Sequence, residues 1–103
     1  MPYPILSDEL YDVVDFAIID GYTVRITFDD ESVQIIDFEP ILLGPLFGQL
    51  RDLELFRQVK LDPELGTLVW PNGADIAPNV LYDWPNQVDA IVQRRRQRFA
   101  VAV

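Results

Sequence analysis

The chain of 103 residues contains no cysteine and no histidine. The lack of cysteine excludes disulfides and thiolate metal sites. The lack of histidine removes the commonest general base and the commonest zinc ligand. An enzyme would have to use carboxylates, a tyrosine or Lys60, the only lysine, and no spacing among the 17 acidic residues singles out a catalytic pair. We therefore expect a non-enzymatic protein with no catalytic residues, no metal ligands and no cofactor.

Long apolar runs are missing as well. No run of 18 apolar residues occurs, so the sequence predicts no membrane span. Residues 1–10 lack a basic segment and carry Asp8 and Glu9, which is not the pattern of a secretory signal peptide. Together with the lack of cysteine, these features favour a cytoplasmic protein.

Basic residues are few, and half of them lie together near the end of the sequence. The net charge is −9, and four of the eight basic residues are Arg94, Arg95, Arg96 and Arg98. The rest of the chain holds all 17 acidic residues against four basic ones. Such a body repels phosphate backbones and anionic membranes and attracts basic proteins. We expect a small basic protein as partner, and neither direct binding to duplex DNA nor binding to a membrane.

Half of the residues are hydrophobic, which is enough for one modest core in a chain of this length. Alternation of apolar and polar residues predicts strands whose apolar sets are Val14, Phe16 and Ile18; Tyr22, Val24, Ile26 and Phe28; and Val33 and Ile35. The expected strands are residues 12–20, 22–28, 32–37, 59–62 and 67–70, and the expected helical segments are residues 41–44, 45–51, 53–59 and 87–98. Asp52 is the expected cap of the segment 53–59, and residues 74–76 are expected to return beside the strand 67–70. This order predicts an α+β fold: a small antiparallel sheet of about five strands with short helices and a C-terminal helix.

The chain divides into three parts on this reading. Residues 1–11 form an extended N-terminal arm, residues 12–84 a single α+β domain, and residues 85–103 a C-terminal helical segment. The arm carries Tyr3, Ile5 and Leu6, which suggest that it docks either on its own domain or on a neighbour.

Residues 66–82, GTLVWPNGADIAPNVLY, hold the densest group of candidate binding residues. The run Pro71-Asn72-Gly73 predicts a tight turn after a short buried strand. Trp70, Asn72, Asp75 and Tyr82 are candidates to line a small-molecule pocket, because such sites combine an aromatic platform with a few polar groups. The alternative is structural: the two aromatic residues belong to the core, and Asn72 and Asp75 satisfy turn backbone. The sequence favours the structural alternative.

The run Asp29-Asp30-Glu31 is the densest acidic group. Carboxylates could bind Mg²⁺ or Ca²⁺ there, but the run lacks the alternating ligands and the glycine of a calcium loop. A solvated turn between two strands is the favoured interpretation.

The C-terminal segment is expected to begin a helix at Gln87, with Asn86 as its N-cap. Its arginines and Phe99 are candidate interaction residues. The arginines could contact nucleic acid or acidic protein, and we favour a basic face lying on acidic neighbours, which either the same chain or a second copy could supply. The segment holds more apolar residues than a tail exposed to water would carry: Val88, Ile91, Val92, Phe99, Val101 and Val103. We therefore also expect a homodimer that forms through this segment. The alternative is a helix folded back on the sheet of its own chain.

The same stretches carry a family resemblance. GTLVWPNGADIAPNVLY, together with RITFDDES, DFEPIL and GPLFGQLRDLELFRQVKLD, resembles a bacterial family of small uncharacterised domains. That family is similar to the N-terminal, non-DNA-binding domain of certain two-domain proteins whose second domain is a helix-turn-helix. The resemblance covers residues 13–82, and WPNGADIAP is its most specific part. Where the family usually has glycine this chain has Glu31, which favours a longer loop around a type I turn over a two-residue turn.

The resemblance implies no established activity. By genomic setting, some members resemble toxin–antitoxin partners, which is an association and not a mechanism. We therefore expect a protein-interaction module, regulatory or antitoxin-like. The alternative is a small-ligand-binding domain or an acidic-site enzyme that uses the region from Trp70 to Asp75.

Overall fold

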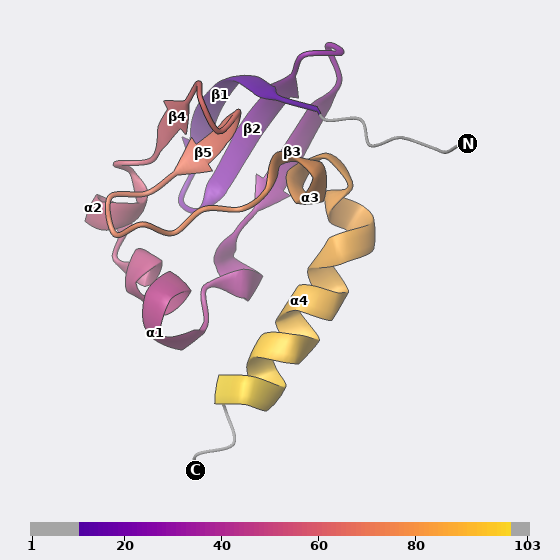
Figure 1. Ribbon diagram of the computed structural model, residues 1–103. Helices are drawn as coiled ribbons and strands as arrows, with labels where there is room; N and C mark the ends of the chain where they lie inside the picture. The colour runs from indigo at the N-terminus through magenta and orange to yellow at the C-terminus, as the bar shows by residue number, and fades with distance from the viewer. Residues whose placement is uncertain (1–10, 100–103) are drawn as a thin grey trace.

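The computed structural model describes residues 11–99, which form an α+β fold (Figure 1). The arm residues Tyr3, Ile5 and Leu6 and the terminal Val101 and Val103 lie outside the described residues. The first three strands form an antiparallel sheet in the order β1-β2-β3, with bounds Val13–Asp20, Thr23–Phe28 and Val33–Asp37. The α+β prediction is confirmed.

The remaining two strands form a sheet of their own. β4 (Lys60–Asp62) pairs antiparallel with β5 (Thr67–Val69), so the five strands are divided between two sheets. The backbone amide of Val13 donates to the carbonyl oxygen of Gly66 at 2.9 Å and joins the two sheets at one corner. Ala74 to Ile76 returns beside β5 as expected, through an isolated bridge between Val69 and Asp75.

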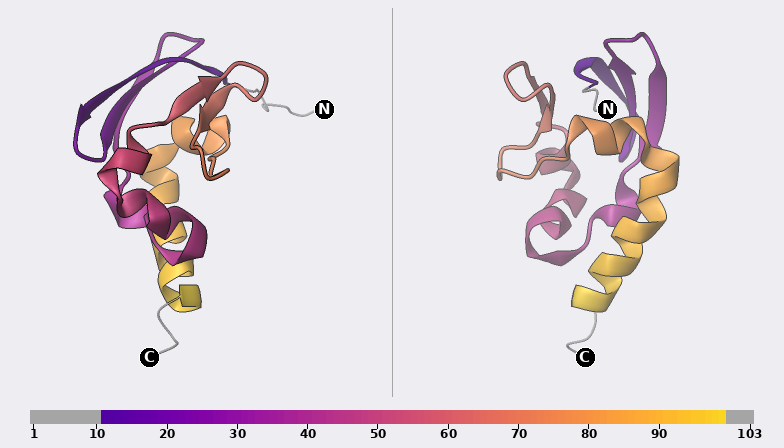
Figure 2. Two further views of the ribbon diagram at one scale, coloured as in Figure 1. Left: turned by 90° about the vertical axis from the view of Figure 1, so that its left-hand side faces the viewer. Right: turned by 45° about the vertical axis from the view of Figure 1, so that its right-hand side comes forward.

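Short helical segments connect the sheets, and a longer helix follows them. The segments between β3 and β4 are η1 (Glu39–Ile41), α1 (Gly44–Phe47), η2 (Gly48–Arg51) and α2 (Leu53–Phe56). After β5 come α3 (Pro78–Tyr82) and α4 (Trp84–Phe99). In Figure 2 the hairpin β4–β5 and α3 lie on one side of the three-stranded sheet, and no described element covers its other side. No helix among residues 11–99 is long and apolar enough to cross a membrane.

The central strand β2 follows the predicted alternation. Val24, Ile26 and Phe28 are buried, and their neighbours on β2 point to the outer face. On β1 the alternation fails at Val14, which is half exposed because a register shift inserts an extra residue between Val13 and Asp15. Phe16 and Ile18 pack against the core as predicted.

The apolar face predicted for β3 is wrong. Val33 and Ile35 point outward, while Ile36 is buried and Gln34 faces the core side. The side-chain amide of Gln34 donates to the carbonyl oxygen of Tyr82 at 2.7 Å, so this inward polar group is satisfied. The alternation of β3 was correct in period but shifted by one residue, which reverses both faces of a strand.

The turn between β2 and β3 sets that register. The amide of Glu31 donates to the carbonyl oxygen of Phe28, and the amide of Phe28 donates to that of Ser32, both at 2.9 Å. Asp29, Asp30 and Glu31 thus form a three-residue loop, longer than a two-residue turn, as the lack of glycine suggested. Glu31 has a φ of 75° and adopts the left-handed conformation that favours glycine.

Two helix starts differ in outcome. Asp52 caps α2 as predicted, since its carboxylate accepts from the amide of Glu54 at 3.0 Å.

The start of α4 was predicted three residues too late, and Asn86 is not an N-cap. Asn86 and Gln87 instead donate their side-chain amides to the carboxylate of Asp83, the residue before the helix, at 2.7 and 3.1 Å. These two hydrogen bonds, that of Asn86 first, lower the pKa of Asp83.

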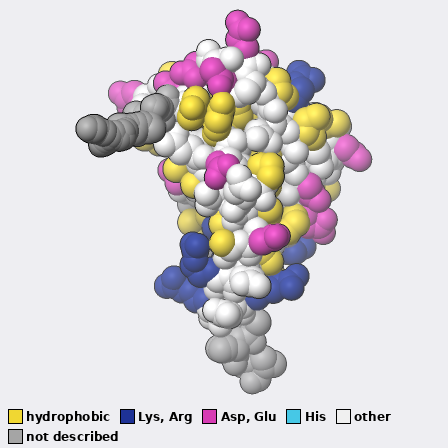
Figure 3. Space-filling model, turned by 90° about the vertical axis from the view of Figure 1, so that its right-hand side faces the viewer, with side chains coloured by type: hydrophobic (Ala, Val, Ile, Leu, Met, Phe, Trp, Pro, Cys, Tyr) yellow, Lys and Arg dark blue, Asp and Glu magenta, His cyan; other side chains and the backbone are white. Residues whose placement is uncertain are grey.

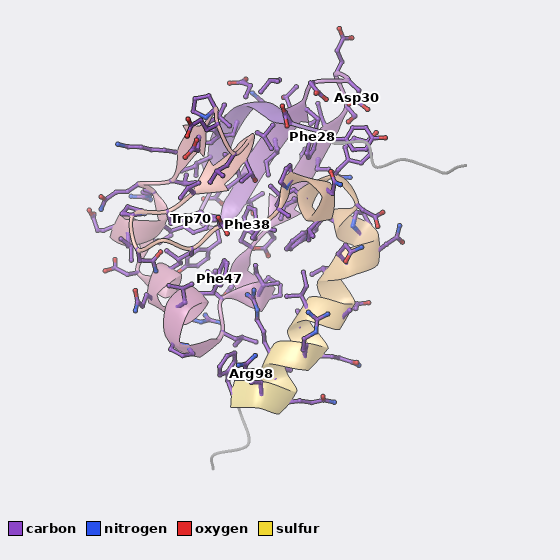
Figure 4. All side chains as sticks on the ribbon, in the orientation of Figure 1. Phe28, Asp30, Phe38, Phe47, Trp70 and Arg98 are labelled. Carbon is purple, nitrogen blue, oxygen red and sulfur yellow. The ribbon has the colours of Figure 1, made fainter. Side chains whose placement is uncertain are left out.

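One aromatic cluster fills the space between the sheets and the short helices. Figure 4 shows Phe38, Phe47 and Trp70 inside the molecule, with Asp30 and Arg98 near opposite ends. Phe38 contacts Trp70 edge to face with ring centroids 5.7 Å apart, and Phe56 lies 5.6 Å from the same indole. α4 closes this core with Trp84, which is buried, and with Val88, Ile91 and Val92, which are partly buried.

Candidate functional site

The four residues proposed for a ligand site do not line one cavity. Trp70 is only 2% exposed, and its indole nitrogen donates to the carbonyl oxygen of Phe56 at 3.0 Å. Asn72 holds its own turn by accepting from the amide of Ala74 at 3.1 Å. Its side-chain amide also donates to the carbonyl oxygen of Leu46 at 3.1 Å and to the side chain of Gln49 at 3.0 Å. These contacts are those of a core aromatic and a turn residue.

Tyr82 takes part in a different cluster. Its ring stacks on that of Tyr11 with centroids 3.7 Å apart and planes 4° apart, and its hydroxyl donates to Asp30 at 2.6 Å. Of the four predicted residues, Asp75 alone lines the groove described below. Its side chain is exposed.

The acidic turn is anchored by this tyrosine. Asp30 accepts hydrogen bonds from the hydroxyl of Ser32 at 2.6 Å, from its amide at 2.9 Å, and from Tyr82. The pKa of Asp30 is lowered, first by the hydroxyl of Ser32 and then by that of Tyr82. The pKa of Tyr82 is raised, mainly by the hydrogen bond to Asp30. Within residues 11–99 no group of three or more acidic side chains is placed to hold a metal ion.

The lowered pKa of Asp30 predicts a pH dependence. The contribution of its carboxylate to stability is present above the pKa of the unfolded chain, about 4, and is lost as the pH falls through the lower folded value. We expect Asp30→Asn to be less stable than wild type at pH 7, and the difference to shrink below about pH 4. Urea unfolding at both pH values measures this. A difference that stays constant with pH would show that the charge of Asp30 is not involved.

A groove with a volume of about 530 Å³ lies between α1 and α4. One wall comes from η1 to α1, the other from α4, and the floor from the segment before α3; the lining side chains are Ile41, Leu43, Pro45, Leu46, Phe47, Asp75, Ile76, Val80, Gln87, Ile91, Arg94, Arg95, Arg98 and Phe99. We call it the α1–α4 groove. Its chemistry is apolar with three arginines along one wall.

Arg95, on α4, lines the groove and contacts its opposite wall. Its guanidinium carbon lies 4.2 Å from the centre of the Phe47 ring, and one of its nitrogens donates to the carbonyl oxygen of Ile41. Partial burial, followed by the neighbouring charge of Arg94, lowers the pKa of Arg95. Arg95 therefore ties α4 to its own domain.

The last residue described, Phe99, closes the end of the α1–α4 groove. A side chain added at Gly44 would meet the ring of Phe99 at 2.5 Å, so the ring lies directly on the backbone of α1. Phe99 is still 40% exposed, and the guanidinium of Arg98 lies 5.6 Å from its centre. The segment thus packs against its own domain, mainly on η1 and α3. The predicted homodimer stays a prediction.

The arginines do not lie on acidic neighbours. Among residues 11–99 the one ion pair is Arg51 with Glu39, at 3.8 Å. Within the described part of the chain, the basic face of α4 therefore forms no ion pair with the acidic body, and acidic neighbours from a second copy stay a prediction. In Figure 3 most of the visible Lys and Arg side chains lie at the lower end of the molecule, while several acidic side chains lie at its upper end.

The outer face of the three-stranded sheet is a second exposed surface, which we call the sheet face. Its central row is Ala17, Arg25 and Ile35, and the next row is Asp15, Thr27 and Val33. Val33 is 50% and Ile35 63% exposed. β3 is an edge strand that pairs with β2 only. Sequence reasoning missed this surface because Val33 and Ile35 alternate with the polar Gln34, a pattern that predicts Val33 and Ile35 on the buried face.

A family comparison matches residues 13–87, about three quarters of the chain, to a family described as protein of unknown function (DUF2442). The chain belongs to this family. The expected family of small uncharacterised domains is thus supported, whereas the WPNGADIAP signature and the likeness to helix-turn-helix proteins stay predictions. No curated protein and no solved structure matches the chain.

The family match covers the sheet face but only part of the α1–α4 groove. It ends at Gln87, so the arginines and Phe99 on α4 lie beyond it. The apolar run from Pro45 to Phe47 was the sequence signal for the opposite wall.

Proposed function

We propose that the protein is a non-enzymatic interaction module that binds a small basic protein through the sheet face. The observation that carries this proposal is the exposure of Val33 and Ile35 side by side on an edge strand. Large apolar side chains that gather on an uncovered face are typical of an interaction surface. An edge strand also offers unpaired backbone groups to a partner strand.

The charges around this face favour a basic partner. The rows on either side of the central row of the sheet face hold three carboxylates, those of Asp15, Asp20 and Asp37. The sheet face has one cation, Arg25 in the central row. The acidic turn from Asp29 to Glu31 extends from the same sheet. A basic protein would be attracted to this end of the molecule and oriented there.

The regulatory form of such binding would be antitoxin-like, with a basic toxin as the partner. The resemblance of some family members to toxin–antitoxin partners supports this role by association. The ligand-binding alternative is weakened because Trp70 is buried and Asp75 is the only one of its four residues that lines the groove.

A capture experiment tests the proposed function. The full chain is used as bait in an extract of its native cell, beside the variants Ile35→Ser and Leu65→Ser. Leu65 is also half exposed, on the turn after β4, and serves as a control for loss of any surface apolar group. We expect a basic protein that binds wild type and Leu65→Ser equally, and Ile35→Ser roughly tenfold or more weakly, the size of a central contact residue.

Titration of the purified partner against the three proteins gives the affinities. Equal binding of all three proteins would exclude the sheet face as the binding surface. Recovery of an acidic partner would contradict the electrostatic part of the proposal.

A further inference from the structure

We propose that β3 accepts an extended segment of the basic partner along its free edge, as an antiparallel fourth strand of the three-stranded sheet. The inference rests on the proposed function, and it states how the partner binds and which kind of segment is recognised. That segment carries apolar side chains at every second position and basic side chains at both ends.

The register between β2 and β3 decides which backbone groups of β3 point away from the sheet. The amide of Phe28 donates to the carbonyl oxygen of Ser32 at 2.9 Å, so this pair is a hydrogen-bonded one. Hydrogen-bonded and non-hydrogen-bonded pairs alternate along an antiparallel ladder, so the backbone groups of Gln34 and Ile36 also face β2. The residues between them point their N–H and C=O groups outward, and we call these groups the β3 edge: Val33, Ile35 and Asp37.

No described element pairs with the β3 edge. Outside the ladder with β2, no backbone hydrogen bond within residues 11–99 involves these three residues. The same residues point their side chains to the sheet face, where Val33 and Ile35 are at least half exposed. An added strand would therefore gain backbone hydrogen bonds and apolar contacts from the same positions.

The opposite edge of the sheet, β1, has features that hinder strand addition, and β3 lacks them. β1 has register shifts near both ends, and its first residue, Val13, is hydrogen-bonded to Gly66 of the other hairpin. Irregular edges discourage pairing with a further strand. β3 pairs with β2 without a register shift, contains no lysine or proline, and has a single charged residue, Asp37, at its end. The regular edge of β3 is therefore the one suited to a partner strand.

Carboxylates at both ends of the β3 edge favour a basic segment. Asp29 and Glu31 are exposed on the turn before β3, and Asp37 is exposed at its end. The carboxylate of Asp37 accepts from the amide of Glu39 at 3.0 Å, which holds it beside the last position of the edge. The five residues of β3 span about 17 Å. Lysine or arginine residues on either side of an apolar run of about this length would lie near these carboxylates.

A synthetic peptide tests the proposal on the full chain. The probe is Lys-Lys-Thr-Val-Thr-Ile-Thr-Val-Thr-Lys-Lys, used at about 0.15 M salt to screen non-specific attraction between exposed charges. We expect a dissociation constant below about 0.1 mM. With about 1 mM peptide, hydrogen exchange at the amides of Val33 and Ile35 should then slow about tenfold, because the bound strand covers them.

N-methylation of the peptide provides the matched control. Residues directly opposite each other in an antiparallel ladder share one face, so the valines turn their side chains to the sheet face and their N–H groups to β3. Methyl groups on the two valine amides should weaken binding tenfold or more. Methyl groups on the amides of the two threonines beside the isoleucine lie on the far edge of the peptide, and should change binding by less than about twofold. Charge and side chains are the same in both peptides.

Three results would overturn strand addition: no binding at about 1 mM peptide, equal effects of the two methylations, or unchanged exchange at Val33 and Ile35 with the peptide bound. The captured basic protein separates this inference from the proposed function. A captured protein that requires Ile35 but leaves these amides unprotected would contradict strand addition alone. Protection by the peptide, with capture that does not depend on Ile35, would contradict the proposed function alone.

Discussion

Replacing Trp70 by alanine is expected to lower the free energy of unfolding by about 3–5 kcal/mol, the usual cost of truncating a buried tryptophan. The indole contacts Phe38, Phe47 and Phe56, so its removal leaves a cavity between three aromatic side chains. It also removes the donor to the buried carbonyl oxygen of Phe56. A domain of this size has a total stability of only about 5–15 kcal/mol.

Urea unfolding measures this loss as a lower midpoint at an unchanged slope. Leu65→Ala is the control, because Leu65 is 53% exposed and its truncation should change stability by no more than about 0.5 kcal/mol. If Trp70→Ala were as stable as this control, Trp70 would not be part of the core, and the ligand-site interpretation of residues 70–82 would regain support.

The elements that the sequence predicted best are those whose pattern has one solution. Alternation in residues 22–28 has apolar residues at every second position and polar ones between them, and β2 follows it. Asp52 before a helical apolar pattern identified a cap correctly. The turn after Trp70 was predicted from Pro71, Asn72 and Gly73, and Gly73 indeed has a positive φ of 92°.

The elements that could not be predicted from the sequence depend on contacts between residues far apart in the chain. β3 has apolar residues in both registers, and its register is selected by the loop at Glu31 and by the bond from Gln34 to Tyr82, 48 positions away. The start of α4 was predicted at a polar residue, whereas the buried Trp84 begins the helix. The groove also lay beyond sequence reasoning, because its two walls are brought together only by the packing of α4 on η1 and of Phe99 on Gly44.

That packing makes a second large effect predictable at Gly44. Gly44 has a φ of 89°, and a methyl group there would also meet the ring of Phe99 at 2.5 Å. We expect Gly44→Ala to lose about 1–2 kcal/mol from the left-handed backbone alone. Because the ring must move, we also expect the last turn of α4 to detach from α1.

Gly73→Ala separates these two effects, since Gly73 has nearly the same φ of 92° but no atom within 4 Å of an added side chain. Both variants should lose the backbone contribution, and only Gly44→Ala should also speed hydrogen exchange at the amides of residues 95–99. Faster exchange in both variants would mean that global unfolding controls these amides. Unchanged exchange in Gly44→Ala would mean that the end of α4 does not depend on the contact of Phe99 with α1, and the surface of Phe99 would then be free for a second copy of the chain.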